Sequence, residues 1–148
     1  MAGGGICLNG AHISINNSSL SGNTAGSYVM DDDIRGGGGG IYIGHYWGEE
    51  EIFISNSFIS NNHASGSHGG GVRVVQRFNG PVILQNTLII GNSSNNEAGA
   101  VEGNDSYIIF DNVTIANNTD ASNVLSFGNG AKTVFTNTII YRNTPSTI

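Results

Sequence analysis

With 148 residues, a formal net charge of −6 and only five lysines and arginines, the chain reads as one acidic domain without a basic patch. That balance excludes nucleic acid as an expected partner. The single cysteine, Cys7, excludes an intrachain disulfide. We expect no membrane span, because no segment is long and apolar enough, and no signal peptide in this chain, because Met1 and Ala2 run directly into glycines.

One pattern, apolar-x-Asn-x-x-apolar-x-x-Asn, occurs five times. Its first asparagines are Asn17, Asn56, Asn86, Asn112 and Asn137, and its second asparagines are Asn23, Asn62, Asn92, Asn118 and Asn143. The first asparagines are 39, 30, 26 and 25 residues apart. Spacings in this range indicate stacked structural repeats.

Short strands with glycine corners are predicted within each repeat. In chain order, glycine clusters lie at 3–5, 38–40 and 69–71, and Ala98-Gly99-Ala100 occupies the equivalent position in the fourth repeat. Each glycine cluster is followed by a short run in which apolar residues occupy alternate positions. The second repeat then predicts three strands, at 41–43, 52–54 and 58–60. Alternation with period two is typical of strands, and the absence of a helical apolar stripe excludes an α-helical solenoid.

The first asparagines are expected at corners, since asparagine tolerates the left-handed backbone conformation that a corner needs. Stacking the repeats places them in a column where side-chain amides can bond to one another. We therefore predict a buried amide ladder through Asn56, Asn86 and Asn112, extended by Asn17 and Asn137. The second asparagines should form a parallel column.

These corners and the Gly-Gly-Gly-Ile strand starts resemble the right-handed parallel β-helix of the pectate-lyase-like superfamily. The segment 61–72, NNHASGSHGGGV, also resembles the repeats of chlamydial polymorphic outer-membrane proteins. The resemblance implies an all-β, right-handed, three-sheet parallel β-helix of about five coils, forming a single domain over residues 1–148 or a fragment of a longer β-helix. That fold hosts lyases, hydrolases, adhesins and tailspikes, so it does not decide the function.

Neither end of the chain shows a capping helix, and uncapped coils expose strand edges that invite pairing. Three interpretations follow: a fragment of a longer β-helix, end-to-end self-association, or shielding by an irregular end.

Two long loops, at 24–35 and 44–51, indicate a binding face on the first two coils. The outward positions of the first strand in successive repeats are Cys7, Tyr42, Arg73, Glu102 and Ser126. In pectate-lyase-like enzymes the cleft lies along this sheet, so the resemblance implies a cleft here. The candidate ligand-binding residues are Tyr42, His45, Trp47, Arg73 and Glu102.

Each candidate also has a simpler interpretation. Arg73 and Glu102 can form an ordinary cross-strand ion pair rather than a catalytic pair. Asp31, Asp32 and Asp33 can bind calcium through their carboxylates, or form a solvated acidic loop. Trp47 can stack on a sugar ring or pack its loop onto the coil. No histidine pair has the spacing of a zinc site, so no cofactor is expected apart from calcium at the three aspartates.

The first sheet lacks the full set of acids and bases that pectate lyases and polygalacturonases use, so no catalytic residue is assigned. We expect a non-catalytic binding or structural module of a bacterial secreted or surface protein that contacts a polysaccharide or surface glycan. The alternative is a polysaccharide lyase or glycoside hydrolase, or a piece of one. A cleft with two or three acids would favour the enzyme, and a flat sheet with Arg73 paired to Glu102 would favour the module.

Overall fold

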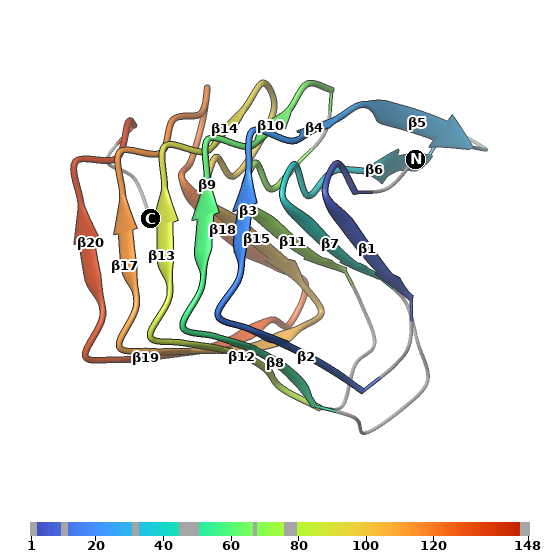
Figure 1. Ribbon diagram of the computed structural model, residues 1–148. Helices are drawn as coiled ribbons and strands as arrows, with labels where there is room; N and C mark the ends of the chain where they lie inside the picture. The colour runs from blue at the N-terminus through green and yellow to red at the C-terminus, as the bar shows by residue number, and fades with distance from the viewer. Residues whose placement is uncertain are drawn as a thin grey trace.

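The computed structural model describes residues 3–9, 12–30, 33–44, 51–66, 68–75 and 80–145, with backbone alone at 27–30 and 33–36. Every regular element in these ranges is a β-strand. The strands wind into stacked coils, and corresponding strands of successive coils pair in parallel (Figure 1). The fold is a parallel β-helix of five coils, as the repeats predict.

Three five-stranded parallel sheets form the walls of the solenoid. The first sheet contains β1 (Ile6–Asn9), β7 (Ile41–Gly44), β11 (Val72–Val75), β15 (Val101–Asn104) and β18 (Leu125–Gly128). The second contains β2 (Ile13–Asn16), β8 (Ile52–Ser55), β12 (Val82–Gln85), β16 (Tyr107–Asp111) and β19 (Lys132–Thr136). The third contains β3 (Ser19–Ser21), β9 (Phe58–Ser60), β13 (Leu88–Ile90), β17 (Thr114–Ala116) and β20 (Ile139–Tyr141).

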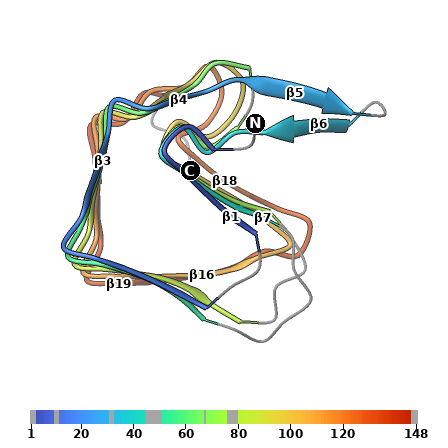
Figure 2. The same ribbon diagram turned by 45° about the vertical axis from the view of Figure 1, so that its right-hand side comes forward.

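Two further elements go beyond the predicted three strands per coil. A short parallel sheet follows the second asparagine of three coils and consists of β4 (Thr24–Ala25), β10 (His63–Ala64) and β14 (Ser93–Ser94). The predicted loop at 24–35 contains an antiparallel hairpin, β5 (Ser27–Met30) with β6 (Asp33–Gly36). Seen nearly along the solenoid axis, this hairpin projects outside the outline of the coils (Figure 2).

The core is a column of aliphatic side chains from alternate strand positions. On the second sheet, Ile54, Leu84 and Phe110 occupy one register position and are each 0% exposed. The first and third sheets contribute equivalent columns, such as Ile41 with Val72 and Val101. Burial therefore depends on stacking between coils, as in other solenoids.

The first asparagine column adopts the predicted conformation but lies on the surface. All five residues have φ between 48° and 54°. Asn86 Nδ2 donates to Asn56 Oδ1 at 3.1 Å, and Asn112 Nδ2 donates to Asn86 Oδ1 at 2.6 Å. Between the first two coils, Asn56 donates to Asn16 rather than to Asn17. These side chains are exposed, so the prediction of a buried ladder at these positions was wrong. The corner turns each side chain outward.

The buried ladder is formed by the second asparagines. Asn62, Asn92 and Asn118 are each 0% exposed. The Oδ1 of Asn62 accepts from the backbone N at 3.0 Å and from the Nδ2 at 2.9 Å of Asn23, and Asn62 donates its own N and Nδ2 to Asn92 Oδ1, each at 3.0 Å. Its remaining amide hydrogen bonds Leu20 O at 2.9 Å. Asn92 and Asn118 repeat this pattern, so every polar group of these amides is satisfied inside the core.

A second corner precedes this ladder. The residue before each second asparagine has a positive φ, at Gly22, Asn61, Gly91, Asn117 and Arg142. Glycine and asparagine accept this conformation readily, whereas arginine does not. The sequence shows this preference in four of the five coils, and Arg142 is the exception.

Candidate functional site

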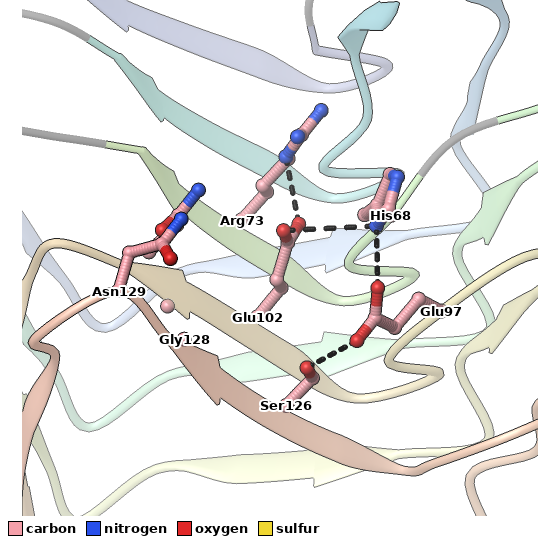
Figure 3. Close-up of a pocket in the computed structure, with 9 residues that line it drawn as sticks. His68, Arg73, Glu97, Glu102, Ser126, Gly128 and Asn129 are labelled. Atoms are coloured by element: carbon pink, nitrogen blue, oxygen red, sulfur yellow. Dashed lines mark hydrogen bonds and ion pairs between the residues drawn. The ribbon is translucent and has the colours of Figure 1, made fainter.

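A polar depression with a cavity volume of about 400 Å³ lies on the first sheet over the third to fifth coils (Figure 3). It is lined by His68, Arg73, Glu97, Glu102, Gly103, Asn104, Ser126, Gly128 and Asn129. Volumes of this size lie in the range of small-molecule sites.

Repeat stacking places the charged side chains of the depression together. Parallel pairing puts Arg73 of β11 beside Glu102 of β15, and Glu102 beside Ser126 of β18. A second column, before the strands, aligns His68 with Glu97 through an isolated parallel bridge. The two columns are separated by the glycine corner at 69–71, and they meet on the outer face of the sheet (Figure 3).

The glycine corner is tight enough to exclude side chains. Gly69 has φ of 69°, and a Cβ at Gly70 would meet Ser93 O at 2.2 Å and Gly99 O at 2.4 Å. Glycine at this point lets the coils approach, and the chain reverses so that His68 returns toward Arg73.

Arg73 and Glu102 form the predicted cross-strand ion pair. Arg73 Nε lies 2.7 Å from Glu102 Oε2, and both side chains are 8% exposed. At this distance the guanidinium and the carboxyl group are in direct contact. Both charges are withdrawn from water, which makes each dependent on the other.

His68 connects this pair to a second carboxyl group. Its Nδ1 lies 3.2 Å from Glu97 Oε2 and 3.7 Å from Glu102 Oε1, while its Nε2 lies 3.2 Å from Asn96 Nδ2. An amide N–H can only donate, so the Asn96 contact leaves the imidazole proton on Nδ1, facing the carboxyl groups. Ser126 Oγ donates to Glu97 Oε1 at 2.5 Å. We call His68, Arg73, Glu97, Glu102 and Ser126 the charged cluster.

Burial moves two protonation equilibria within the charged cluster. It raises the pKa of Glu102 to about 7, although Arg73 opposes the rise and Glu97 adds to it. Burial also lowers the pKa of His68, and Arg73 lowers it further, against the opposing effect of Glu97. Burial therefore favours the uncharged forms of both Glu102 and His68, whereas Arg73 favours the charged form of Glu102.

Amide groups line the other part of the depression. Asn104 ends β15, and Asn129 follows β18 with φ of 48°. Asn104 Oδ1 is buried and has no hydrogen-bond partner among the described residues. A buried acceptor without a donor costs free energy, so a small rotation of the Asn104 side chain that brought this oxygen to the surface of the depression would let a ligand hydroxyl or amide satisfy it.

The structure brings two of the five predicted ligand-binding residues together in the depression. Arg73 and Glu102 both line the depression, whereas the Tyr42 ring lies against Gly44, where a Cβ would meet its Cε1 at 2.3 Å. His45, Trp47, Asp31 and Asp32 lie outside the described residues, and so does the side chain of Asp33. The predicted wall around Tyr42 and the calcium alternative therefore stay predictions.

Four polar side chains of the lining were missed, in addition to Gly103 and Gly128: those of His68, Glu97, Asn104 and Asn129. Extending the repeat alignment four residues before each strand would have put His68 and Glu97 in one column, since they precede Val72 and Val101 equally. Nothing in the sequence indicates that this column folds back over Arg73 and Glu102.

Among the described residues, the charged cluster resembles neither a metal centre nor a catalytic pair of carboxyl groups with free space between them. Among the described residues no group of three or more His, Cys, Asp or Glu side chains is arranged to hold a metal ion. The imidazole of His68 contacts both carboxyl groups, so the two acids are linked through it. The cluster can exchange a proton near neutral pH, and the neighbouring amides can hydrogen-bond a ligand.

Comparison of the chain with protein-family models, curated proteins and solved structures finds no match. The described part of the chain contains no helix with the length and apolar character needed to cross a membrane.

Proposed function

We propose that this β-helix is a non-catalytic binding module, and that the depression on its first sheet holds a saccharide. The observation that carries the proposal is the grouping of the Asn104 and Asn129 amides with the Ser126 hydroxyl and two carboxyl groups around one depression of ligand size. Saccharides present many hydroxyl groups that both donate and accept, which suits amides, a hydroxyl and carboxyl oxygens grouped on one surface.

The electrostatics favour a neutral saccharide over an acidic one. An arginine is the side chain best suited to receive an acidic sugar, but the Nε of Arg73 is buried against Glu102. Side-chain exposure is greater at Glu97, which is 37% exposed, so the accessible charge in the cluster is a carboxyl group. A ligand carboxylate would approach this group and a chain of net charge −6.

The wider setting is also proposed. A glycan-binding β-helix with low charge and stacked asparagines fits a bacterial secreted or surface protein of the pectate-lyase-like type. The parallel coils and the asparagine columns support the β-helix part of this proposal. The bacterial, secreted or surface setting rests on the sequence resemblance.

Calorimetric titration tests the proposal. The probes are the hexaoses of cellulose, xylan, starch and chitin, with hexagalacturonate as the acidic comparison. We expect one neutral hexaose to bind, and Asn104→Ala to weaken it at least tenfold, about 1.4 kcal/mol. The matched control is Asn9→Ala, which changes the same strand-end position on the first coil, outside the depression. Failure of all neutral hexaoses to bind, or equal weakening by both variants, would overturn the proposal.

A second candidate, a polysaccharide lyase or glycoside hydrolase, rests on one observation. Glu102 has a pKa of about 7 next to another carboxyl group, which is the property of a general acid. Against it, His68 contacts both acids and Glu102 is buried against Arg73. Reducing-end release, or absorbance of an unsaturated product, from the same hexaoses would favour this candidate if Glu102→Gln abolished it.

A further inference from the structure

The turn between β18 and β19 has an asparagine followed by a glycine at its centre. The Gly128 O accepts a hydrogen bond from the Ala131 N at 3.1 Å, and Asn129 and Gly130 between them have φ of 48° and 82°. Positive φ at both central positions is the mark of a type I′ turn, which asparagine followed by glycine adopts at little cost. The shape of this corner therefore favours the Asn-Gly sequence.

The dipeptide is exposed at the depression on the first sheet. Asn129 is one of the lining residues, and both Asn129 and Gly130 are exposed. Within the described part of the chain, neither the Asn129 side chain nor the Gly130 N–H forms a hydrogen bond. Figure 3 shows Asn129 apart from the dashed contacts that join the charged cluster. The Asn129 side chain can therefore rotate toward the next main-chain nitrogen, and water reaches both groups.

We propose that Asn129 is a site of spontaneous deamidation, which replaces an amide of the depression with a carboxylate. In the first step the main-chain nitrogen of Gly130 attacks Cγ of Asn129. The bond between this nitrogen and Cγ forms, and the bond between Cγ and Nδ2 breaks. The Nδ2 group leaves as ammonia with the proton that the Gly130 nitrogen loses, and a succinimide ring remains.

Water then opens the ring at either of its carbonyl carbons. Cleavage of the bond between the Gly130 nitrogen and Cγ gives an aspartate at position 129. Cleavage of the bond between the same nitrogen and the main-chain carbonyl carbon gives an isoaspartate, in which the main chain runs through the former side chain. One water is consumed and one ammonia is released, so the reaction needs no oxidant, reductant or further reactant.

Glycine at position 130 leaves the attacking nitrogen unshielded, because it carries no side chain. Asn112 is the internal comparison, since it is also exposed and has φ of 54°. It is followed by Val113, whose branched side chain is 1% exposed in the core. Branching shields the Val113 nitrogen, and close packing holds this residue in place. The same attack should therefore be slow at Asn112.

Deamidation changes what the depression offers to a ligand. An amide both donates and accepts hydrogen bonds, whereas a carboxylate only accepts them. The new charge lies in the same depression as Glu97 and Glu102. The formal net charge changes from −6 to −7, because one neutral amide becomes an anion. The depression therefore becomes more acidic as the molecule ages.

Peptide mapping by mass spectrometry tests the proposal on the folded 148-residue chain. The chain is incubated in mildly alkaline buffer and sampled over weeks, and fragment ions assign each replacement of –NH₂ by –OH to its residue. We expect the change to accumulate at least about tenfold faster at Asn129 than at Asn112. A more acidic species should appear in ion-exchange chromatography at the same rate.

Gly130→Asn is the matched variant. Asparagine tolerates positive φ, and a Cβ at position 130 would meet only Asp105 Oδ1, at 3.5 Å, which is an ordinary contact. The variant therefore keeps the turn but shields the attacking nitrogen, and modification of Asn129 should slow at least about tenfold. Circular dichroism should show the variant folded.

A folded chain that stays unmodified at Asn129 overturns the proposal. So does equal modification of Asn112, or a folded Gly130→Asn variant that reacts at the rate of the parent. No saccharide takes part in these measurements, so their outcome is independent of the proposed binding function.

Discussion

Asn62 and Asn92 bond to each other inside the core, with the Nδ2 of Asn62 3.0 Å from the Oδ1 of Asn92 and neither residue exposed to solvent. The same pair is joined by a backbone N to Oδ1 bond of 3.0 Å. Each amide thereby fixes the register between coils, because a slip of one residue would leave buried donors and acceptors unpaired.

Replacing Asn92 with leucine should be severely destabilising. The change removes the acceptor of two Asn62 donors and the donor to Ile59 O, and each buried unsatisfied group costs roughly 1–3 kcal/mol. We expect a loss of at least about 3 kcal/mol in urea unfolding. Asn86→Leu, at an exposed corner, should lose about 1 kcal/mol, mainly from its positive φ. Equal losses for both variants would contradict the assignment of the buried ladder.

Gly70→Ala should disrupt the corner that positions His68. Its Cβ would meet two backbone oxygens at 2.2 and 2.4 Å, and backbone from two coils cannot move aside cheaply. We expect a loss of about 3 kcal/mol or more. Gly26→Ala is the control, because a Cβ there meets nothing within 4 Å. Thermal unfolding measured for both should show a large drop for the first variant alone, and a parent-like Gly70→Ala would refute the tight corner.

Arg142→Asn should stabilise the protein. Arg142 has φ of 51° at the corner where Asn61 and Asn117 have 53° and 54°. Asparagine tolerates this conformation better, so we expect a gain of about 0.5–1 kcal/mol. The guanidinium also lies 5.1 Å from the Tyr141 ring centroid, an exposed contact worth little. A stability equal to or below the parent's in urea unfolding would show that the strain is offset.

Glu102 should make stability fall as pH rises. In the folded protein its pKa is about 7, whereas the unfolded chain has the ordinary value of 4.5. The folded state therefore binds more protons between these values, and stability decreases from about pH 4.5 to about pH 7, by on the order of 3 kcal/mol. His68, with its pKa lowered from 6.5, acts in the opposite direction.

Glu102→Gln isolates this contribution, since the variant keeps His68, Arg73 and Glu97. The unfolding free energy of the parent minus that of the variant should decline across pH 4.5–7 and level off above it. A difference that stays constant with pH would mean that Glu102 titrates normally in the folded state.

The repeats predict the strands and their register well because both follow from local alternation and from glycine and asparagine corners. The strand expected at 58–60 is β9, and the column of Tyr42, Arg73 and Glu102 forms as expected. Which asparagine column is buried could not be read from the same pattern, since both columns share one spacing. The direction of each side chain depends on the three-dimensional corner.

The sequence predicts only part of the candidate site, because it reveals which strand residues stack but not how a corner folds. Strand periodicity identifies Arg73 and Glu102, because residues of one register position stack directly. His68 and Glu97 precede the glycine corner, and their approach to the ion pair depends on how that corner folds back. The sequence of the four-residue strand β15 likewise does not reveal that Glu102 is buried, which is what raises its pKa.

The most direct test of saccharide binding is an NMR titration of the ¹⁵N-labelled chain with the neutral hexaose that binds best by calorimetry. The amide shifts should move at residues that line the depression on its last two coils: Glu102, Gly103, Asn104, Ser126, Gly128 and Asn129. The amides of Asn56, Asn86 and Asn112, on the exposed asparagine column, should remain in place. Shifts confined to that column or to other sheets, or no shift at saturating hexaose, would contradict a saccharide site in the depression.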